Sequence, residues 1–355
     1  MKRVVILGGG YGGLRIIEHL LTPDLPQNVF VTLVDRMPFH GLKTEYYALA
    51  AGTEPESKVR VPFPSDPRLN IKYGEVASVQ LDQQRVLFTN GDTLAYDWLV
   101  IGLGCEDRYH DIPGAEEYTH SIQTMNATRN TFAALNNINP YGTVTVVGGG
   151  LSGVEIASEL RESRPDLNIR LMDRGESILS PFPKKLQKYA SEWFLEHDVQ
   201  LISMANVKRV EPGVVYNHDE PLESDVIVWT AGIQANRVVR ELPVEQDHIG
   251  RAVLNKYHQL PNHPNVFVVG DCASLPFAPS AQLAEAQGEQ IAFILKKDFN
   301  GESYPDTLPM IKLKGVLGSL GKKEGFGLMG KVSLVGQMPR VMKSGVLWLY
   351  KKHLG

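Results

Sequence analysis

Two glycine-rich segments of the same kind lie 140 residues apart in this 355-residue chain, at Gly8–Gly13 and Gly148–Gly153. Each follows a short run of apolar residues, and after the next apolar run comes an aspartate, Asp35 or Asp173. This order is typical of a buried strand, a tight turn, a helix and a second strand, in which the turn binds a pyrophosphate and the acid binds a ribose hydroxyl. We therefore expect two bound dinucleotides, and two dinucleotides indicate electron transfer between them.

The first segment has the residue types that a phosphate-binding turn requires. Glycines let the backbone approach a pyrophosphate, and the helix that begins there presents N–H groups and a positive dipole end. The alternative is a structural turn between a strand and a helix. We expect contacts from Asp35 and from the turn residues, which are Gly8, Gly10, Tyr11, Gly12 and Gly13.

The second segment predicts the same contacts for a second nucleotide. Asp173 favours NADH over NADPH, because a carboxylate repels a 2′-phosphate. Arg170 and Arg174 flank it; Arg174 either reaches such a phosphate or is a solvated surface charge. The predicted turn residues are Gly148, Gly150, Leu151, Ser152 and Gly153.

Two further carboxylates lie near these predicted turns. Glu155 follows Gly153 in the first turn of a helix, where an acid either stabilises the helix dipole or orients the hydride donor. Asp271 ends a strand and is followed by Ser280, a candidate N-cap. Asp271 either binds a flavin hydroxyl or phosphate group or caps a turn, and the helix after Ser280 would aim its positive end at a flavin ring.

Charge is unevenly distributed along the chain. The net charge is −4, yet residues 312–355 carry nine Lys and Arg and one Glu, which leaves −12 on residues 1–311. A basic segment on an acidic body indicates an anionic partner, and we expect lipid rather than nucleic acid. From Pro339 the sequence predicts an interfacial amphipathic helix, with a docked helix or a dimer contact as the alternative.

Composition excludes several classes of protein. The two cysteines, Cys105 and Cys272, provide neither a disulfide framework nor a metal-ligand cluster, so no metal is expected. The chain enters a strand at once and has no run of 18 uncharged apolar residues, so we expect a cytoplasmic protein without a spanning helix, peripheral on the membrane.

The apolar periodicity predicts an α/β fold with two nucleotide-binding units. Strands are expected at 3–7, 29–34, 97–102, 144–147, 169–172, 199–202, 207–210, 214–216, 225–229 and 265–271, with a hairpin in 71–90 that ends at Asn90-Gly91. Helices are expected at 12–21, 44–51, 126–135, 184–196 and 281–297.

These motifs together resemble the two-dinucleotide flavoproteins, and most closely the type II NADH:quinone oxidoreductases. The resemblance covers nearly the whole chain. It is carried by Gly8–Gly13, Ala50–Thr53, Tyr96–Gly104, Ile112–Gly114, Val147–Glu155, Val228–Gly232, Val269–Cys272 and Ser280–Gly288.

The resemblance implies a fold, cofactors and site residues. The fold is two Rossmann-like domains, FAD-binding at 1–113 and 240–311 and NADH-binding at 114–239, with a membrane-associating region at 312–355. Beyond the first turn and Asp35, the implied FAD contacts are Arg36, Lys43, Val76, Gly104, Asp271 and Ala281. Beyond the second turn and Asp173, the implied NADH contacts are Ala231 and Gly232, and the implied catalytic residues are Glu155, Gln282 and Lys314.

One departure from the family pattern concerns the electron acceptor. Family members line a quinone tunnel with two glutamines; Gln282 matches the first, but Ala286 stands in place of the second and Gln287 follows it. An offset of one residue turns a helical side chain by about 100°. Lys314-Gly315 resembles a lysine–glycine pair that family members have near the same tunnel. We predict a quinone acceptor, with a soluble NAD(P)H reductase for a protein or other acceptor as the alternative.

Three other functions are less favoured. A thiol-disulfide reductase needs a redox cysteine pair, and residues 40–55 contain none. Sulfide chemistry at Cys105 and Cys272 is a remote alternative, because buried apolar packing is the default for free cysteines. No sequence feature supports a non-catalytic sensor of FAD and NADH. The sequence leaves open whether the chain forms a homodimer.

Overall fold

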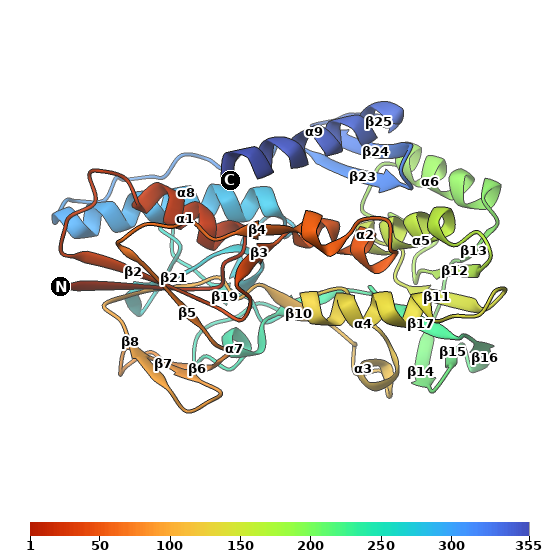
Figure 1. The fold of residues 1–355 in the computed structure, drawn as a ribbon, viewed down its shortest axis with the longest axis horizontal. Coiled ribbons are helices and arrows are strands. Elements are labelled where there is room, and N and C mark those ends of the chain that lie inside the picture. Colours follow the sequence, from red (N-terminus) through yellow and green to blue (C-terminus); the bar gives the residue numbers. More distant parts are fainter. Residues whose placement is uncertain (355) are drawn as a thin grey trace. The chain divides into compact units, whose positions relative to one another are not determined.

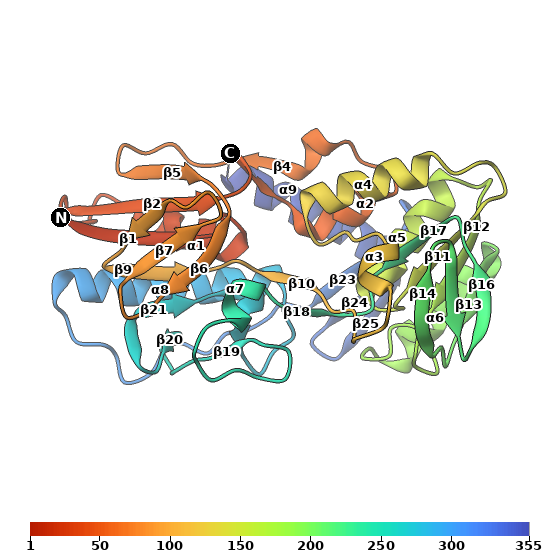
Figure 2. The same cartoon turned by 90° about the horizontal axis from the view of Figure 1, so that it is seen from below.

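The computed structural model describes residues 1–354. The chain divides into two compact units (Figures 1 and 2). Unit 1 comprises Met1–Gly41, Val61–Glu106 and Gln234–Leu313, and unit 2 comprises Leu42–Arg60, Asp107–Ile233 and Lys314–Gly355.

Unit 1 is built on a six-stranded sheet in the order β20-β21-β9-β1-β2-β5. Its strands are β1 (Lys2–Leu7), β2 (Val29–Asp35), β5 (Leu69–Tyr73), β9 (Trp98–Ile101), β20 (Gln259–Leu260) and β21 (His263–Val268). β1 pairs in parallel with β2 and β9, and only β20 runs antiparallel to its neighbour. The carboxyl end of β1 therefore opens into the first glycine segment, as predicted.

Helices α1 (Tyr11–Leu20) and α8 (Ala281–Asn300) lie against each other in unit 1 (Figure 1). A Cβ on Gly288 would lie 2.8 Å from the Gly12 carbonyl oxygen, so glycine at this position permits the close approach. The Ser280 hydroxyl accepts from the Leu283 amide at 3.2 Å, which confirms the predicted N-cap.

The predicted hairpin is a three-stranded sheet of β6 (Val76–Gln80), β7 (Arg85–Phe88) and β8 (Thr93–Ala95), with Gly91 at φ +87° in the turn. The remaining short elements of unit 1, or at its ends, are β3 (Phe39–Gly41), β4 (Arg60–Pro62), β10 (Cys105–Asp107), β18 (Ile233–Ala235), α7 (Arg237–Arg240), β19 (Ala252–Val253), η3 (Gly270–Cys272) and β22 (Ala273–Ser274).

Unit 2 is built on a parallel four-stranded sheet in the order β13-β12-β11-β17. Its strands are β11 (Thr143–Val147), β12 (Asn168–Met172), β13 (Val199–Ile202) and β17 (Val226–Trp229). The helices are η1 (Lys43–Glu45), α2 (Tyr46–Ala50), η2 (Glu56–Val59), α3 (Ala115–Tyr118), α4 (Met125–Asn136), α5 (Leu151–Ser163) and α6 (Lys184–Glu196). An antiparallel sheet of β14 (Val207–Glu211), β15 (Val214–Asn217) and β16 (Glu220–Glu223) completes this part.

The unit bounds differ from the predicted domain bounds at residues 42–60. This segment was predicted within the first domain, yet it belongs to unit 2. The reason is apolar packing: Tyr47, Ala48 and Ala50 of α2 are buried in one core cluster with Val154 and Leu160 of α5.

The C-terminal segment differs most from expectation. Residues 314–355 belong to unit 2 rather than forming a region of their own. It contains an antiparallel sheet that was not expected from the sequence, formed by β23 (Val316–Leu320), β24 (Glu324–Met329) and β25 (Val332–Gly336). The predicted helix follows this sheet as α9 (Gln337–Leu354). Gly321 and Gly330 lie in the turns of this sheet, both at positive φ. These two glycines were the sequence signal that could have indicated the turns.

Candidate functional site

The first glycine loop has the geometry of a phosphate cradle. Gly8 adopts φ +98°, and a Cβ on Gly13 would lie 2.1 Å from the Gly8 carbonyl oxygen, so both positions require glycine. Gly10 precedes α1 without a side-chain cap, and a Cβ there would meet nothing within 4 Å. The loop therefore fits a pyrophosphate at the amides of the first helical turn.

Asp35 is attached to this loop by its carboxylate. Its Oδ2 accepts from the Gly9 amide at 2.7 Å, and its Oδ1 accepts from the Met37 amide at 2.8 Å. Burial raises the pKa of Asp35, and the Met37 and Gly9 amides oppose that shift. The acid is thus part of the loop's own frame as well as a candidate ribose ligand.

His40, which no sequence motif singled out, also contacts this loop. The side chain is 1% exposed, and its Nδ1 lies 2.8 Å from the Gly9 carbonyl oxygen. The Tyr11 ring contacts it edge to face, at 4.8 Å between centroids. A polar residue between Phe39 and Leu42, both buried, was the only available signal.

The second glycine loop reproduces this frame. Gly148 adopts φ +110°, and a Cβ on Gly153 would lie 1.8 Å from the Gly148 carbonyl oxygen. The Gly149 amide donates to Asp173 Oδ2 at 2.8 Å, and the Gly175 amide donates to Asp173 Oδ1 at 2.7 Å. Here too the glycine before the helix has no side-chain cap, so Leu151 and Ser152 begin α5 with open amides.

The two arginines beside Asp173 differ in their surroundings. The Arg170 guanidinium donates to Gln200 at 3.0 Å and to Thr145 at 3.2 Å, so it links neighbouring strands. Arg174 is exposed. The Arg170 contacts do not favour a 2′-phosphate site.

The Ala231-Gly232 loop of unit 2 is held by residues that precede α3. His110 Nε2 donates to the Ala231 carbonyl at 2.8 Å, and the Arg108 amide donates to the Gly232 carbonyl at 3.0 Å. Gly232 adopts φ +133°. This arrangement places the loop directly after β17, at the same sheet edge as the second glycine loop.

Asp271 of unit 1 has an unexpected thiol neighbour. Cys105 Sγ donates to Asp271 Oδ2 at 3.1 Å, and Cys272 Sγ donates to the Gly104 carbonyl at 2.9 Å. Both thiols are buried, and burial raises the pKa of Cys272, with Asp271 and Cys105 adding to the shift. A high pKa leaves little thiolate for redox chemistry.

The other residues implied for FAD have diverse surroundings. Val76 is buried in the apolar core of unit 1, and Arg36 is exposed with Glu75 at 3.5 Å. Ala281 begins α8. Lys43 belongs to η1 of unit 2 rather than to unit 1.

The glutamines of α8 differ in their burial and in their contacts. Gln287 is fully buried, and its Oε1 accepts from the Gly270 amide at 2.9 Å, so it supports the turn before Asp271. Gln282 and Ala286 are half-buried and lie one helical turn apart on another face. Gln287 therefore does not replace the glutamine that Ala286 lacks.

Glu155 is paired within unit 2 by a residue of the C-terminal helix. Lys343 Nζ lies 2.5 Å from Glu155 Oε1, 3.7 Å from Glu45 Oε1 and 2.7 Å from the Tyr47 hydroxyl. The Ser319 amide donates to Glu155 Oε1 at 3.0 Å. Side-chain exposure is only 12% for Lys343, 6% for Glu155 and 9% for Glu45, so the group forms a buried acid–base cluster.

The charges of this cluster depend on each other. Burial raises the pKa of Glu155, and Lys343 opposes the shift. Burial alone would lower the pKa of Lys343, but Glu155, Tyr47 and Glu45 outweigh it and raise the pKa. Lys343 therefore remains an ammonium group beside two carboxyl groups. Glu155 lies in the second turn of α5, which begins at Leu151, and a glutamate buried there requires such a cation. An acid among the buried residues of a helix was the sequence signal for this pairing.

Two more acids continue the same face of α5. Glu159 is 1% exposed, with Arg340 and Lys322 among the charges near it. Glu162 accepts from the Lys322 amide at 2.7 Å. Part of the basic C-terminal charge thus neutralises an acidic stripe within unit 2.

Lys314, the third implied catalytic residue, is exposed at the start of the C-terminal segment. Gly315 follows it at φ +146°, where a Cβ would lie 2.4 Å from the Leu328 carbonyl oxygen. Lys314 belongs to unit 2, whereas Gln282 belongs to unit 1.

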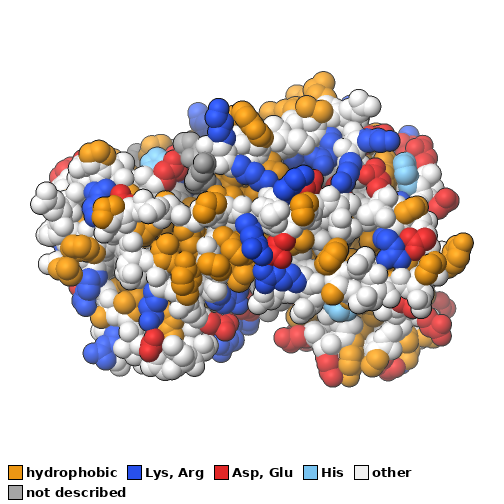
Figure 3. Space-filling view, viewed as in Figure 1, with side chains coloured by type: hydrophobic (Ala, Val, Ile, Leu, Met, Phe, Trp, Pro, Cys, Tyr) orange, Lys and Arg blue, Asp and Glu red, His pale blue; other side chains and the backbone are white. Residues whose placement is uncertain are grey.

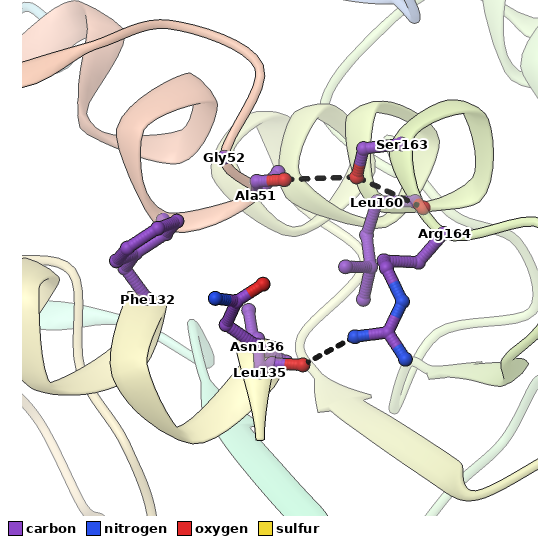
Figure 4. A pocket seen from close by; sticks show the side chains of 9 residues that line it. Ala51, Gly52, Phe132, Leu135, Asn136, Leu160, Ser163 and Arg164 are labelled. Atoms are coloured by element: carbon purple, nitrogen blue, oxygen red, sulfur yellow. Dashed lines mark hydrogen bonds between the residues drawn. The ribbon is translucent and has the colours of Figure 1, made fainter. Parts of the chain in front are cut away.

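A separate hollow of about 210 Å³ opens between the ends of α2, α4 and α5 (Figure 4). Its polar wall is already engaged: Ser163 donates to the Ala51 carbonyl at 2.8 Å, and Arg164 donates to the Leu135 carbonyl at 2.9 Å. This hollow offers no reactive group.

Within residues 1–354, no three His, Cys, Asp or Glu side chains gather as a metal site. None of the described helices, α9 included, has the length and apolar character needed to cross a bilayer.

Comparisons with known proteins agree with this geometry. The family model of the pyridine nucleotide-disulphide oxidoreductases matches residues 2–288. The NADH dehydrogenase-like protein YutJ of Bacillus subtilis (strain 168) is 58% identical over 355 residues, with 100% of both chains covered. The type II NADH:quinone oxidoreductase of Staphylococcus haemolyticus (strain JCSC1435) is 25% identical over 378 residues, covering 96% of this chain and 93% of that one.

Solved structures share the fold. The sulfide:quinone oxidoreductase of Aquifex aeolicus superposes with a TM-score of 0.84 at 19% identity, covering 100% of this chain and 91% of that one. NDH2 of Plasmodium falciparum in complex with NADH superposes with a TM-score of 0.83 at 16% identity, covering 99% and 96%. The predicted fold of two Rossmann-like domains is confirmed, and so is the family resemblance. The chain belongs to the pyridine nucleotide-disulphide oxidoreductase family as an NADH dehydrogenase-like oxidoreductase, for which the family implies FAD as cofactor and NADH as substrate.

Proposed function

We propose that the protein oxidises NADH through FAD and passes two electrons to a quinone. FAD occupies the first glycine loop in unit 1, and NADH occupies the second in unit 2. The observation that carries this proposal is the repeated frame, in which Gly9 is bonded to Asp35 and Gly149 to Asp173 at nearly equal distances. When bound, the flavin supplies the hydride and electron chemistry.

The chain's own residues bind and orient the two dinucleotides. The open amides at the start of α1 and α5 face the pyrophosphates, and Asp35 and Asp173 serve the riboses. Asp173 supports NADH rather than NADPH as the substrate, since Arg170 has no phosphate-binding role. The further proposed FAD contacts are Arg36, Val76, Gly104, Asp271 and Ala281 of unit 1 and Lys43 of unit 2. The further proposed NADH contacts are Ala231 and Gly232 of unit 2.

The acid–base cluster is the proposed source of protons. Glu155 is a buried carboxyl group with a raised pKa, next to the ammonium group of Lys343. Reduction of a quinone consumes protons, so a group that holds protons inside the protein suits this reaction. Glu155 would hold and release the proton, and Lys343, Tyr47 and Glu45 would set its charge.

A quinone acceptor is supported by relatives and by two residues. Proteins named type II NADH:quinone oxidoreductases are 25–26% identical to this chain over nearly its whole length. Gln282 lies half-buried on α8, and Lys314 is exposed. Both stay proposed quinone-site residues.

The second candidate is a reductase with a protein or other non-quinone acceptor. It is favoured by Ala286, because Gln287 is committed to the Gly270 amide and leaves that helix face with a single glutamine. The decisive experiment is oxidation of NADH and NADPH by the purified flavoprotein with menaquinone, ubiquinone and ferredoxin as acceptors. We expect turnover with NADH and a quinone. Turnover with ferredoxin alone would establish the second candidate, and absence of bound flavin would contradict both.

We also infer that α9 lies on an anionic membrane surface. The cationic face of this helix is turned toward unit 2 through Lys343, Arg340 and Lys351, whereas apolar side chains are exposed (Figure 3). The exposed residues are Met338 at 64%, Val341 at 70%, Val346 at 57%, Trp348 at 60% and Leu349 at 61%. An outward apolar face with the exposed Lys352 near its end suits an interfacial helix.

A further inference from the structure

Gly9, the middle residue of the first glycine loop, is held by two hydrogen bonds, one at its N–H and one at its C=O. Its N–H donates to Asp35 Oδ2 at 2.7 Å, and its C=O lies 2.8 Å from His40 Nδ1. A carbonyl oxygen can only accept, so Nδ1 must carry the hydrogen. His40 is therefore a donor of fixed tautomer in this contact.

The surroundings of His40 preserve that state. The ring is 1% exposed, and burial lowers its pKa to about 4. At neutral pH the imidazole is uncharged, with its hydrogen on Nδ1. The Tyr11 ring packs edge to face against it, so the first residue of α1 also restrains the ring.

The second glycine loop indicates that this hold is a requirement of the loop. The corresponding carbonyl, that of Gly149, accepts from the Leu179 backbone amide at 2.7 Å. The same carbonyl is thus secured in both units, by a side chain in one and by the main chain in the other. A contact that recurs by different chemical means answers a geometric need.

We propose that His40 is a positioning residue for FAD: by donating to the Gly9 carbonyl, it orients the glycine loop whose amides face the pyrophosphate. This inference rests on the proposed placement of FAD at the first glycine loop. The Gly9 carbonyl and the Gly10 amide belong to one peptide plane, so rotation of that plane would turn the amide away from its ligand. His40 prevents that rotation while Asp35 fixes the preceding plane.

The test compares two nearly isosteric variants, His40→Leu and His40→Asn. Asn can place an N–H donor near the position of Nδ1, and Leu cannot. After removal of flavin we expect the Kd of FAD to rise about tenfold in His40→Leu and less than about threefold in His40→Asn, the scale of one positioning hydrogen bond. The KM of NADH should stay within about twofold, because the second loop uses Leu179.

Val86→Ala is the matched control, because Val86 is fully buried in unit 1 but belongs to β7, outside the segments that form the loop. It should lower the unfolding midpoint without changing the Kd of FAD. Equal FAD affinity in wild type and His40→Leu, or equal losses in the Leu and Asn variants, would overturn the inference. If wild type itself binds no FAD, the proposed function fails instead.

A second measurement does not depend on the variants folding. In wild-type protein labelled with ¹⁵N-histidine, the buried histidine that binds Gly9 should carry its hydrogen on Nδ1. A hydrogen on Nε2, with Nδ1 bare, would overturn the inference.

Discussion

The two glycine loops share one backbone frame, yet the carbonyl of the middle glycine is held by the His40 side chain in unit 1 and by the Leu179 amide in unit 2. The backbone solution has a conformational cost, because Leu179 adopts φ +54°, which costs about 1–2 kcal/mol for a residue with a Cβ. Full burial of the Leu179 side chain offsets that cost. A glycine motif therefore specifies which groups need a partner, but not which partner they receive.

The helices that follow the loops are also covered differently. In unit 1, α1 packs on α8, where Gly12 and Gly288 permit close approach. In unit 2, α5 presents Glu155, Glu159 and Glu162 to the C-terminal segment, which supplies Lys343, Arg340 and Lys322. The α1–α8 contact thus depends on close backbone approach, whereas the cover of α5 also includes buried charge.

The ionic support of unit 2 should give the largest effect. Lys343→Met leaves Glu155 and Glu45 buried without their cation, so we expect a loss of about 3–5 kcal/mol in the free energy of unfolding, measured by urea titration. Adding Glu155→Gln should recover part of the loss. Equal stability of Lys343→Met and wild type would contradict the buried pair.

The next largest effect on stability is expected from His40, the titratable side chain that supports the glycine loop of unit 1. Unfolded His40 has a pKa near 6.5 and folded His40 one of about 4. Between these values the unfolded chain binds the proton and the folded chain does not, so stability falls as pH falls, by roughly 3 kcal/mol in total. The Tyr11 ring contacts the imidazole, and Asp35 binds Gly9 from the other side.

His40→Asn should remove this portion of the acid slope when unfolding is measured from pH 7 to pH 4. His258 and His120, whose pKa values burial also lowers, remain in both proteins and cancel in the difference. An unchanged slope would show that His40 is protonated when folded.

Alanine at the last glycine of each loop should separate the two sites. A Cβ on Gly13 or Gly153 meets a backbone carbonyl at 2.1 or 1.8 Å, so each variant should lose about 2–3 kcal/mol of stability. Gly13→Ala should lose flavin absorbance, whereas Gly153→Ala should keep it and lose NADH binding. Loss of flavin from both variants would break the assignment of one cofactor to each loop.

The smallest stability effect is expected on the exposed face of α9. Trp348→Ser, at a side chain 60% exposed, should change the free energy of unfolding by less than about 0.5 kcal/mol. Its sedimentation with vesicles rich in anionic lipid should nevertheless fall. Ser344→Ala, on an exposed polar position of the same helix, is the control. Unaltered vesicle binding of Trp348→Ser would exclude this face as the membrane contact.

Local sequence determined the main strands and helices of the two nucleotide-binding units and both glycine loops. The runs before Gly8 and Gly148 could only be buried parallel strands, and the left-handed φ of these glycines follows from the turn that each strand must make. Asp35 and Asp173 were predictable because the motif places an acid at the end of the next strand. Ser280 capped α8 as its position predicted.

Tertiary structure alone decided what holds these elements. The partners of Gly9 and Glu155, His40 and Lys343, are 31 and 188 residues away. The periodicity from Pro339 onward predicted an amphipathic helix, but it could not say which face turns inward, because burying Lys343 is favourable only where Glu155 and Glu45 are already buried. Local patterns specify backbone geometry, whereas the pairing of buried polar groups depends on distant segments that meet only in the folded chain.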